Sequence, residues 1–372
     1  MLDEHLGYVA DAVRLDRYKA AIAKAVSPGD TVADLGCGSG VLGMLCLQAG
    51  AGHVYAVDDS AMIEIARDTL MRAGHGVHTT FIHGKSSQID LPERVDAVIC
   101  DHVGYFGFDY RVIEFLEDAR RRFLKPAGTL IPSRILPHIA AVGSQKCSEL
   151  VNSWQAEKIP AEFHWLREYS VNTKHAVKLE KTDVLSAPAV LGEIDLHADN
   201  PAFFSWSTEL HIQRDDVMHG LAGWFECELA EDVWMTNSPL AEKPIHRPQV
   251  FLPINEVVPV KAGDVIQVTV MARPSEHLIA WNVFFPETGR RFNHSTWQGM
   301  MLSPENLIRG NPDRVPHLSR EGQARLIVLA YCDGKNTAQE VEQAVLRDHP
   351  GLFPSPAEIS DFILRVLGRD TE

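Results

Sequence analysis

Three glycines at alternate positions follow a short apolar segment near the start of the chain. The segment Val32–Leu35 runs into Gly36-Cys37-Gly38-Ser39-Gly40, and the apolar residues 41–49 that come next are typical of a helix. Glycine adopts positive φ and lets a ligand approach the backbone more closely than a Cβ would allow. A strand, a glycine turn and a helix in this order predict a site for a nucleotide-type ligand. An ordinary tight turn between a strand and a helix is the alternative.

Acidic residues follow the second expected strand, about twenty residues beyond the glycine turn. Asp58, Asp59 and Ser60 stand there. A carboxylate at this place accepts hydrogen bonds from both hydroxyls of a ribose, which we expect of Asp58. Asp59 and Ser60 could instead simply cap the next helix, and we expect Ser60 to be the cap. A polar turn, Gly84-Lys85-Ser86-Ser87, follows the third strand. Small polar residues in such a turn need no ligand to explain them.

A third polar loop joins the fourth strand to a helix and is both acidic and aromatic. Its side chains include Asp101, His102, Tyr105, Asp109 and Tyr110. A carboxylate in such a loop can orient a nucleophile and receive its proton. Much further along, His246 and Arg247 lie in a proline-flanked segment, residues 244–251.

The elements that position these loops alternate between strand and helix. Strands are expected at 30–35, 53–57, 79–83, 95–100 and 129–131, and helices at 41–49, 61–73 and 110–124. This alternation predicts a mostly parallel sheet with helices on both faces, in which ligands lie beyond the carboxyl ends of the strands. Each polar loop comes directly after a strand, so we expect these loops to meet at one edge of the sheet.

These stretches together resemble the class I S-adenosylmethionine-dependent methyltransferases, and more specifically the protein arginine methyltransferases. The glycine turn, with an acidic residue two places before it, is similar to the first motif of the class I enzymes. The closer resemblance lies in His5 with Asp11-Ala12-Val13-Arg14 and Tyr18, the glycine turn with Asp58 and Gly84-Lys85, Asp101 with Gly104-Tyr105, and residues 120–134 ending in Leu130-Ile131-Pro132-Ser133.

The resemblance implies that S-adenosyl-L-methionine is the methyl donor and S-adenosyl-L-homocysteine the product. Arg14 would contact the methionine carboxylate, Asp58 the ribose, and residues 85–87 the adenine. The residues expected to line the cofactor are Arg14, Asp34, Gly36, Cys37, Gly38, Gly40, Asp58, Asp59, Lys85, Ser86, Ser87 and Asp101.

The acceptor side departs from that family. There, two glutamates at the two ends of the loop grip the target guanidinium, whereas this chain has Asp101 at the first place and Tyr110 at the second. The neighbouring Asp109 would either restore the second carboxylate by a shift of one residue or cap the helix that follows. The family's Thr-His-Trp loop corresponds to Ile245-His246-Arg247, in which a cation replaces the tryptophan. An arginine there repels an arginine substrate unless a carboxylate neutralises it.

Two sets of residues are therefore expected on the acceptor side. The expected catalytic residues are Asp101, His246, Asp109 and Tyr110, with Asp101 as the first candidate for the proton-accepting group and His246 as the second. The expected substrate-binding residues are His102, Tyr105, Tyr110 and Arg247. No metal ion is expected.

The chain divides by pattern into four parts. Residues 1–27 are expected to form helices over the cofactor, and residues 28–135 a Rossmann-like domain of the α/β class. Residues 136–302 alternate apolar and polar positions in several stretches, which predicts an antiparallel β-barrel or sandwich. The resemblance places a dimerisation arm at 156–196 and implies a homodimer.

The fourth part, residues 303–372, is expected to be a small helical domain after a linker. The run Leu329–Thr337 resembles the PqqD-like peptide-binding domain, which binds a leader peptide as an added strand against a winged-helix body. A β-hairpin ahead of it is not obvious between Leu307 and Leu318. A helical cap on the β domain is the alternative.

Composition limits the classes of partner. The formal net charge of −15 over 372 residues disfavours nucleic acid. No apolar run approaches the ~20 residues that span a bilayer, a signal peptide is not recognisable, and the six cysteines form no C-x-x-C pair. We therefore expect a cytoplasmic protein with neither a membrane nor a nucleic-acid partner.

The expected function is methyl transfer to a side chain of a peptide or protein. Arginine is the leading acceptor by resemblance, and a ribosomally made precursor peptide with a leader is a candidate substrate. The alternatives are another acceptor side chain, a small molecule, or a catalytically silent subunit that binds peptide.

Overall fold

The computed structural model describes residues 2–371 of the chain, and the side chains of residues 5–371. The chain forms two compact units, and the boundary between them in the sequence falls between Met300 and Met301. The first unit contains a parallel sheet with its helices and an antiparallel region; the second contains helices.

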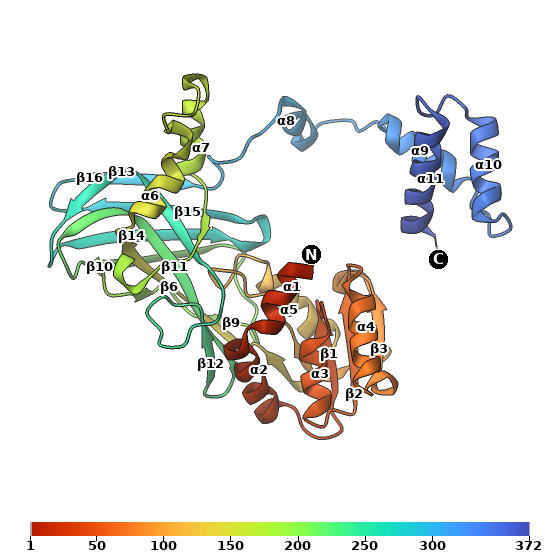
Figure 1. The fold of residues 1–372 in the computed structure, drawn as a ribbon, viewed down its shortest axis with the longest axis horizontal. Coiled ribbons are helices and arrows are strands. Elements are labelled where there is room, and N and C mark those ends of the chain that lie inside the picture. The colour runs from red at the N-terminus through yellow and green to blue at the C-terminus, as the bar shows by residue number, and fades with distance from the viewer. Residues whose placement is uncertain (1, 372) are drawn as a thin grey trace. The chain divides into compact units, whose positions relative to one another are not determined.

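A five-stranded parallel sheet forms the first half of the first unit (Figure 1). Its strands, in spatial order, are β3 (Thr79–His83), β2 (His53–Asp58), β1 (Thr31–Leu35), β4 (Val95–Ile99) and β5 (Leu124–Ile131). The strand order reverses between β1 and β4, and ligands of open α/β sheets bind at such a switch point, beyond the carboxyl ends of the strands. The glycine turn after β1 and the loop after β4 therefore lie side by side.

The helices of this half cover the sheet as expected, with small differences at their ends. They are α3 (Val41–Gln48), α4 (Met62–Arg72) and α5 (Val112–Arg122). The helix α5 begins two residues later than predicted, because Arg111 precedes it with a left-handed φ of 61°. Ahead of the sheet, α1 (Leu2–Ala10) and α2 (Ala12–Ala25) are joined at Asp11. Arg14 and Tyr18 lie on the buried face of α2.

The antiparallel region contains two hydrogen-bonded sheets. One sheet has the order β7 (His175–Val177), β13 (Gln249–Val260), β11 (Asp216–Ala230), β6 (Arg134–Val142) and β8 (Ala189–Val190), with β12 (Val233–Thr236) paired to β11 and β9 (Ile194–Asp195) to β6. The other has the order β10 (Phe204–His211), β14 (Val265–Arg273), β15 (Leu278–Phe285) and β16 (Arg290–Ser295).

The two sheets share one hydrophobic core, which includes Leu221 of β11 and Val268 of β14. An antiparallel bridge between Ser186, just before β8, and Ile212, just after β10, also connects them. The region is therefore an antiparallel sheet domain, and its closure into a barrel stays a prediction.

A helical arm rises from the antiparallel sheets and contains α6 (Gln145–Asn152) and α7 (Arg167–Val171) (Figure 1). Three large aromatic side chains of this arm are exposed to solvent: Trp154 by 41%, Phe163 by 50% and Trp165 by 56%. Such a concentration of exposed apolar surface is typical of an interaction face. Dimerisation through residues 156–196 stays a prediction.

The second unit consists of four helices: α8 (Pro304–Gly310), α9 (Arg320–Leu329), α10 (Ala338–Asp348) and α11 (Pro356–Asp370). The last three share a core that contains Val328, Val345 and Phe362. Thr337 and Glu340 form a capping box at the start of α10, as their spacing predicts. Residues 301–371 contain no strand, so the winged-helix expectation lacks its β-hairpin here. The search for membrane spans finds none among the described helices.

The loop after β4 is packed closely against the antiparallel region. A Cβ added to Gly107 would meet Ile135 Cγ2 of β6 at 2.7 Å, and one added to Gly223 of β11 would meet the Phe106 ring at 2.5 Å. Asn237 Nδ2 also donates to the Tyr105 carbonyl at 2.8 Å. The antiparallel sheets therefore hold this loop in place.

This packing predicts the effects of two matched substitutions. Gly107 and Gly263 have φ of 94° and 96°, but nothing lies within 4 Å of an added Cβ at Gly263. Gly263→Ala should cost only backbone strain, about 1–2 kcal/mol. Gly107→Ala should cost roughly 1–3 kcal/mol more, because the methyl group overpacks the interface with β6. Urea unfolding measures both, and equal losses would contradict the close packing.

Candidate active site

The conformation of the glycine turn after β1 is fixed by its backbone. Gly36, Gly38 and Gly40 have φ of 66°, 52° and 79°. The amides of Gly36 and Cys37 donate to the Val57 carbonyl at 2.8 and 3.0 Å, which ties the turn to β2. A Cβ on Gly40 would press on Ala66 at 3.1 Å, so this glycine serves helix packing.

Asp58, at the end of β2, links the glycine turn to the next loop. Its Oδ2 accepts from the Gly38 amide at 2.8 Å, and its Oδ1 accepts from the Ser60 amide and hydroxyl at 2.9 and 2.6 Å. Ser60 Oγ in turn accepts from the Met62 amide at 3.2 Å at the start of α4. The carboxylate is thereby oriented, and its Oδ2, which accepts only from the Gly38 amide, retains a lone pair for a further donor.

A cavity of about 220 Å³ lies against this carboxylate. Its lining combines residues from the loops after β1, β2, β3 and β4 and from α5: Gly36, Val57, Asp58, Asp59, Gly84, Lys85, Ser86, Ser87, His102 and Phe115. The structure thus brings together six of the residues predicted to line the cofactor.

His102 also lines this cavity, although it was predicted on the substrate side. Its ring lies 4.7 Å from that of Phe115, and a Cβ on Gly36 would meet it at 2.1 Å. Burial lowers the pKa of His102, so the ring is neutral, and its buried Nδ1 has no hydrogen-bond partner among the described residues. An unsatisfied polar atom at the wall of a cavity is a position that a ligand can satisfy.

The cavity fits the nucleoside part of S-adenosylmethionine. It offers an oriented carboxylate for ribose hydroxyls, a polar atom without a partner, and a glycine where a side chain would clash. Asp34 and Cys37 lie beside it, both buried. Asp34 Oδ2 accepts from the Gly43 amide at 2.8 Å, so Asp34 holds α3 to the strand before the turn.

Asp101 is the centre of a second, buried cluster. Arg14 Nε and Arg247 Nη2 both donate to its Oδ2, at 2.6 and 2.9 Å, and the Tyr18 hydroxyl donates to its Oδ1 at 3.2 Å. The side chains of Arg14, Arg247 and Asp101 are 5%, 7% and 11% exposed. Burial alone would raise the pKa of Asp101, but the two guanidinium groups hold it below its usual range, so the carboxylate is ionised.

Arg14 is positioned by the start of α2. Asp11 caps this helix by accepting from the Arg14 amide at 3.0 Å, and Arg14 Nη1 donates to the Tyr8 carbonyl at 2.9 Å. Its Nη2 makes no hydrogen bond with a described group, which leaves a donor for an anionic ligand. The carboxylate of the cofactor's methionine part has the charge and acceptors to fill this place.

The segment before β13 approaches the same cluster through its backbone. The His246 amide donates to Asp11 Oδ2 at 2.6 Å. The His246 side chain itself is exposed, so contact with Asp101 comes from Arg247 and not from the predicted imidazole.

Asp109 supplies no open second carboxylate. Its Oδ1 accepts from the Tyr105 and Phe106 amides at 2.9 and 3.0 Å, and its Oδ2 pairs with Lys174 Nζ at 3.0 Å. The N-cap of α5 is Arg111, so Asp109 does not cap that helix either, which corrects both readings of Asp109. The acidic side chain instead closes the turn of its own loop.

Tyr110 lies at the far end of the loop, with its side chain 44% exposed and its ring 5.5 Å from that of Tyr105. Burial raises the pKa of Tyr110, and the neighbouring Tyr105 adds to the shift, so the phenol stays neutral. Two further residues of the site were not predicted from sequence. Lys174 and Asn237 reach the loop from 65 and 132 residues away, and neither belongs to a recognisable motif.

Comparison with known proteins agrees with this architecture. Residues 32–128 match the profile of a methyltransferase domain, and residues 136–280 that of the arginine methyltransferase oligomerization subdomain. The chain is 28% identical to protein arginine N-methyltransferase 6 of Xenopus laevis over 286 residues, 73% of this chain and 84% of that protein. It is also 28% identical to protein arginine N-methyltransferase 1 of Schizosaccharomyces pombe, over 73% of this chain and 82% of that protein.

Two solved structures share the fold. One is the Trypanosoma brucei PRMT1 enzyme–prozyme heterotetrameric complex with AdoHcy, with a TM-score of 0.71 and 22% identity over 79% of this chain and 98% of that one. The other is Arabidopsis thaliana protein arginine methyltransferase 10 in an open conformation, with a TM-score of 0.69 and 21% identity over 80% and 98%. At these identities the likeness shows the fold. Residues 301–372 lie outside both matched profiles.

The buried carboxyl group of Asp34 should make the free energy of unfolding depend on pH. Burial raises the pKa of Asp34 to about 7 from its ordinary 3.8, so the folded chain keeps a proton that the unfolded chain loses. The free energy of unfolding should therefore fall as the pH rises from about 4 to about 7, by roughly 4 kcal/mol at most, and then level off. Asp34→Asn should remove this part of the fall, and Asp68→Asn on the exposed face of α4 should keep it. Denaturant unfolding at several pH values tests this, and parallel curves for wild type and Asp34→Asn would refute it.

Proposed function

We propose that this chain, an S-adenosylmethionine-dependent methyltransferase similar to the protein arginine methyltransferases, transfers a methyl group to an arginine side chain of a peptide or protein. The observation that carries the proposal is the buried, ionised carboxylate of Asp101 at the carboxyl end of β4. It stands between Arg14 and the segment before β13, across the strand-order reversal from the glycine turn.

The cofactor, when bound, supplies a methyl group on a positively charged sulfur. Asp58 would accept from the ribose hydroxyls, and Arg14 would pair with the carboxylate of the methionine part. Both groups are already oriented by hydrogen bonds to the chain. Holding the donor in one place is a major part of catalysis, because it removes the entropic cost of bringing the reactants together.

Asp101 would act on the acceptor. A guanidinium donates hydrogen bonds to a carboxylate, and an ionised carboxylate orients the nitrogen and receives its proton as the N–C bond forms. The second carboxylate of the related enzymes is replaced by Tyr110, whose neutral phenol offers one acceptor. We therefore expect arginine to be held through one carboxylate in this chain.

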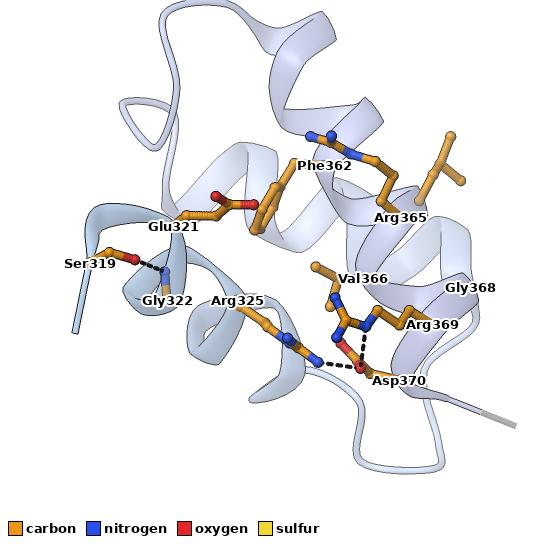
Figure 2. A pocket seen from close by; sticks show the side chains of 11 residues that line it. Ser319, Glu321, Gly322, Arg325, Phe362, Arg365, Val366, Gly368, Arg369 and Asp370 are labelled. Atoms are coloured by element: carbon orange, nitrogen blue, oxygen red, sulfur yellow. Dashed lines mark hydrogen bonds and ion pairs between the residues drawn. The ribbon is translucent and has the colours of Figure 1, made fainter. Parts of the chain in front are cut away.

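The C-terminal unit would bind part of the peptide substrate. A groove of about 750 Å³ between α9 and α11 is lined by three arginines, by Phe362 and by the acidic Glu321 and Asp370; the arginines are Arg325, Arg365 and Arg369 (Figure 2). Asp370 pairs with Arg325, whereas Arg365 has no ion pair with a described residue and lies over the Phe362 ring at 5.8 Å. An acidic and apolar segment of a peptide has the charge that complements this groove. A PqqD-like role in leader recognition would use this groove in place of an added strand.

Methyl transfer itself is the first test. The full chain, with cofactor and arginine-containing peptides, should add a mass of one methyl group to the arginine. Asp101→Asn should lower kcat by about 10²–10⁴, because the proton acceptor is lost. The affinity for S-adenosylhomocysteine should stay within about tenfold of wild type, since Asp58 and Arg14 remain.

The surface variant Asp199→Asn is the control and should behave as wild type. Normal cofactor binding without methyl gain on any peptide would reject the enzyme and favour a silent binding subunit. Equal losses of turnover and cofactor affinity in Asp101→Asn would assign Asp101 to the cofactor.

The groove predicts a separate effect on substrate affinity. Arg365→Glu should raise the KM for a long acidic precursor peptide about tenfold and leave kcat and the KM of a short arginine peptide unchanged. Arg347→Glu on α10, outside the groove, is the matched control. Steady-state kinetics of the four combinations measure this. Equal KM values for Arg365→Glu and Arg347→Glu would remove the groove from substrate binding.

A further inference from the structure

The guanidinium of Arg247 is paired with the Asp101 carboxylate, which in the proposed reaction binds the acceptor arginine. Arg247 Nη2 donates to Asp101 Oδ2 at 2.9 Å, and its Nη1 lies 3.4 Å from the Gly104 carbonyl of the same loop. Its side chain is 7% exposed. One guanidinium of the chain therefore already uses the acceptors that an incoming guanidinium needs.

The described residues around the cluster leave no other carboxylate for a substrate. Asp109 is bound by two amides and Lys174, and its side chain is 1% exposed. Asp11 is bound by the Arg14 and His246 amides. In the proposed complex Arg14 also pairs with the cofactor's carboxylate, whereas Arg247 has only Asp101 as its ion-pair partner. A further guanidinium on Asp101 would therefore be repelled by Arg247 in this buried place.

We infer that Arg247 is an internal occupant of the acceptor position, which competes with the substrate arginine for Asp101 and so sets acceptor affinity. The inference rests on the proposed arginine-directed function. A substrate arginine binds Asp101 only in the fraction of molecules in which Arg247 has moved away, so the apparent affinity falls by that fraction. Binding energy from parts of the substrate remote from the arginine must then offset the competition.

For a substrate guanidinium to replace that of Arg247 on Asp101, only the Arg247 side chain has to move. The backbone of its segment is held independently, by the His246 amide on Asp11 at 2.6 Å and by the Arg247 amide on the Ile245 carbonyl at 2.8 Å. Asp101 also keeps Arg14 and Tyr18 when Arg247 leaves, so it does not become an unpaired buried charge.

The test measures binding, so that it does not depend on turnover. The full chain, saturated with S-adenosylhomocysteine, is titrated with acetyl-arginine amide in a calorimeter. Arg247→Gln and Arg247→Met remove the competing charge and should each bind this probe at least about tenfold more tightly than wild type. Arg247→Lys keeps a charge and should stay close to wild type, as should Arg290→Gln, whose arginine pairs with Glu256 elsewhere on the surface.

A second substitution ties any gain to the carboxylate. Adding Asp101→Asn to Arg247→Gln should abolish the tighter binding. Equal or weaker probe binding by both Arg247→Gln and Arg247→Met, with normal affinity for S-adenosylhomocysteine, would overturn the inference and make Arg247 neutral or helpful to the substrate. Failure of the proposed function is seen separately, as the absence of methyl gain on arginine peptides.

Discussion

One buried carboxylate holds the active site together. Asp101 accepts from two guanidinium groups that lie 87 and 146 residues away in sequence, and from the Tyr18 hydroxyl. Removing these charges from water is costly, and mutual pairing with several hydrogen bonds offsets that cost. Removing Asp101 would leave two buried cations without their partner. The helix α2, the end of β4 and the segment before β13 thus depend on one another through this cluster.

The cluster forms where it does because of two features of the fold. The strand order reverses between β1 and β4, which places the glycine turn and the Asp101 loop next to each other. The antiparallel sheets then press on that loop, through Gly107 against β6 and through Asn237 on the Tyr105 carbonyl. The parallel sheet supplies the cofactor cavity, and the antiparallel region determines the shape of the acceptor side.

The two sides of the site differ in how closely they match the residues that the family resemblance implies. On the cofactor side the glycine turn, Asp58 and Arg14 are present, each in a contact that orients it. On the acceptor side the resemblance implies a carboxylate where Tyr110 lies, the neighbouring Asp109 pairs with Lys174, and Arg247 pairs with Asp101. Enzymes that use the same methyl donor but different acceptors are expected to differ in such loops. The scaffold that binds the donor does not depend on these loops.

The sequence by itself determined the parts that depend on local chemistry. Alternating apolar segments predicted the parallel sheet and the ends of most strands, and three glycines with Asp58 predicted the cofactor cavity, because strand periodicity and φ preference are properties of short segments. Asp101 was chosen through the family resemblance of its loop. The contacts of Asp109 and His102 could not be derived in this way.

These features are contacts between distant residues, and only the tertiary structure decided them. The bridge between Ser186 and Ile212 connects the two antiparallel sheets across 26 residues of sequence. Lys174 forms an ion pair with Asp109, and the His102 ring packs against the Phe115 ring in the cavity. The sequence identifies Arg247 only as a cation at the position where the resembled family has the tryptophan of its Thr-His-Trp loop. Packing of two loops brings it to Asp101, because a buried carboxylate and a buried guanidinium each require a partner of opposite charge.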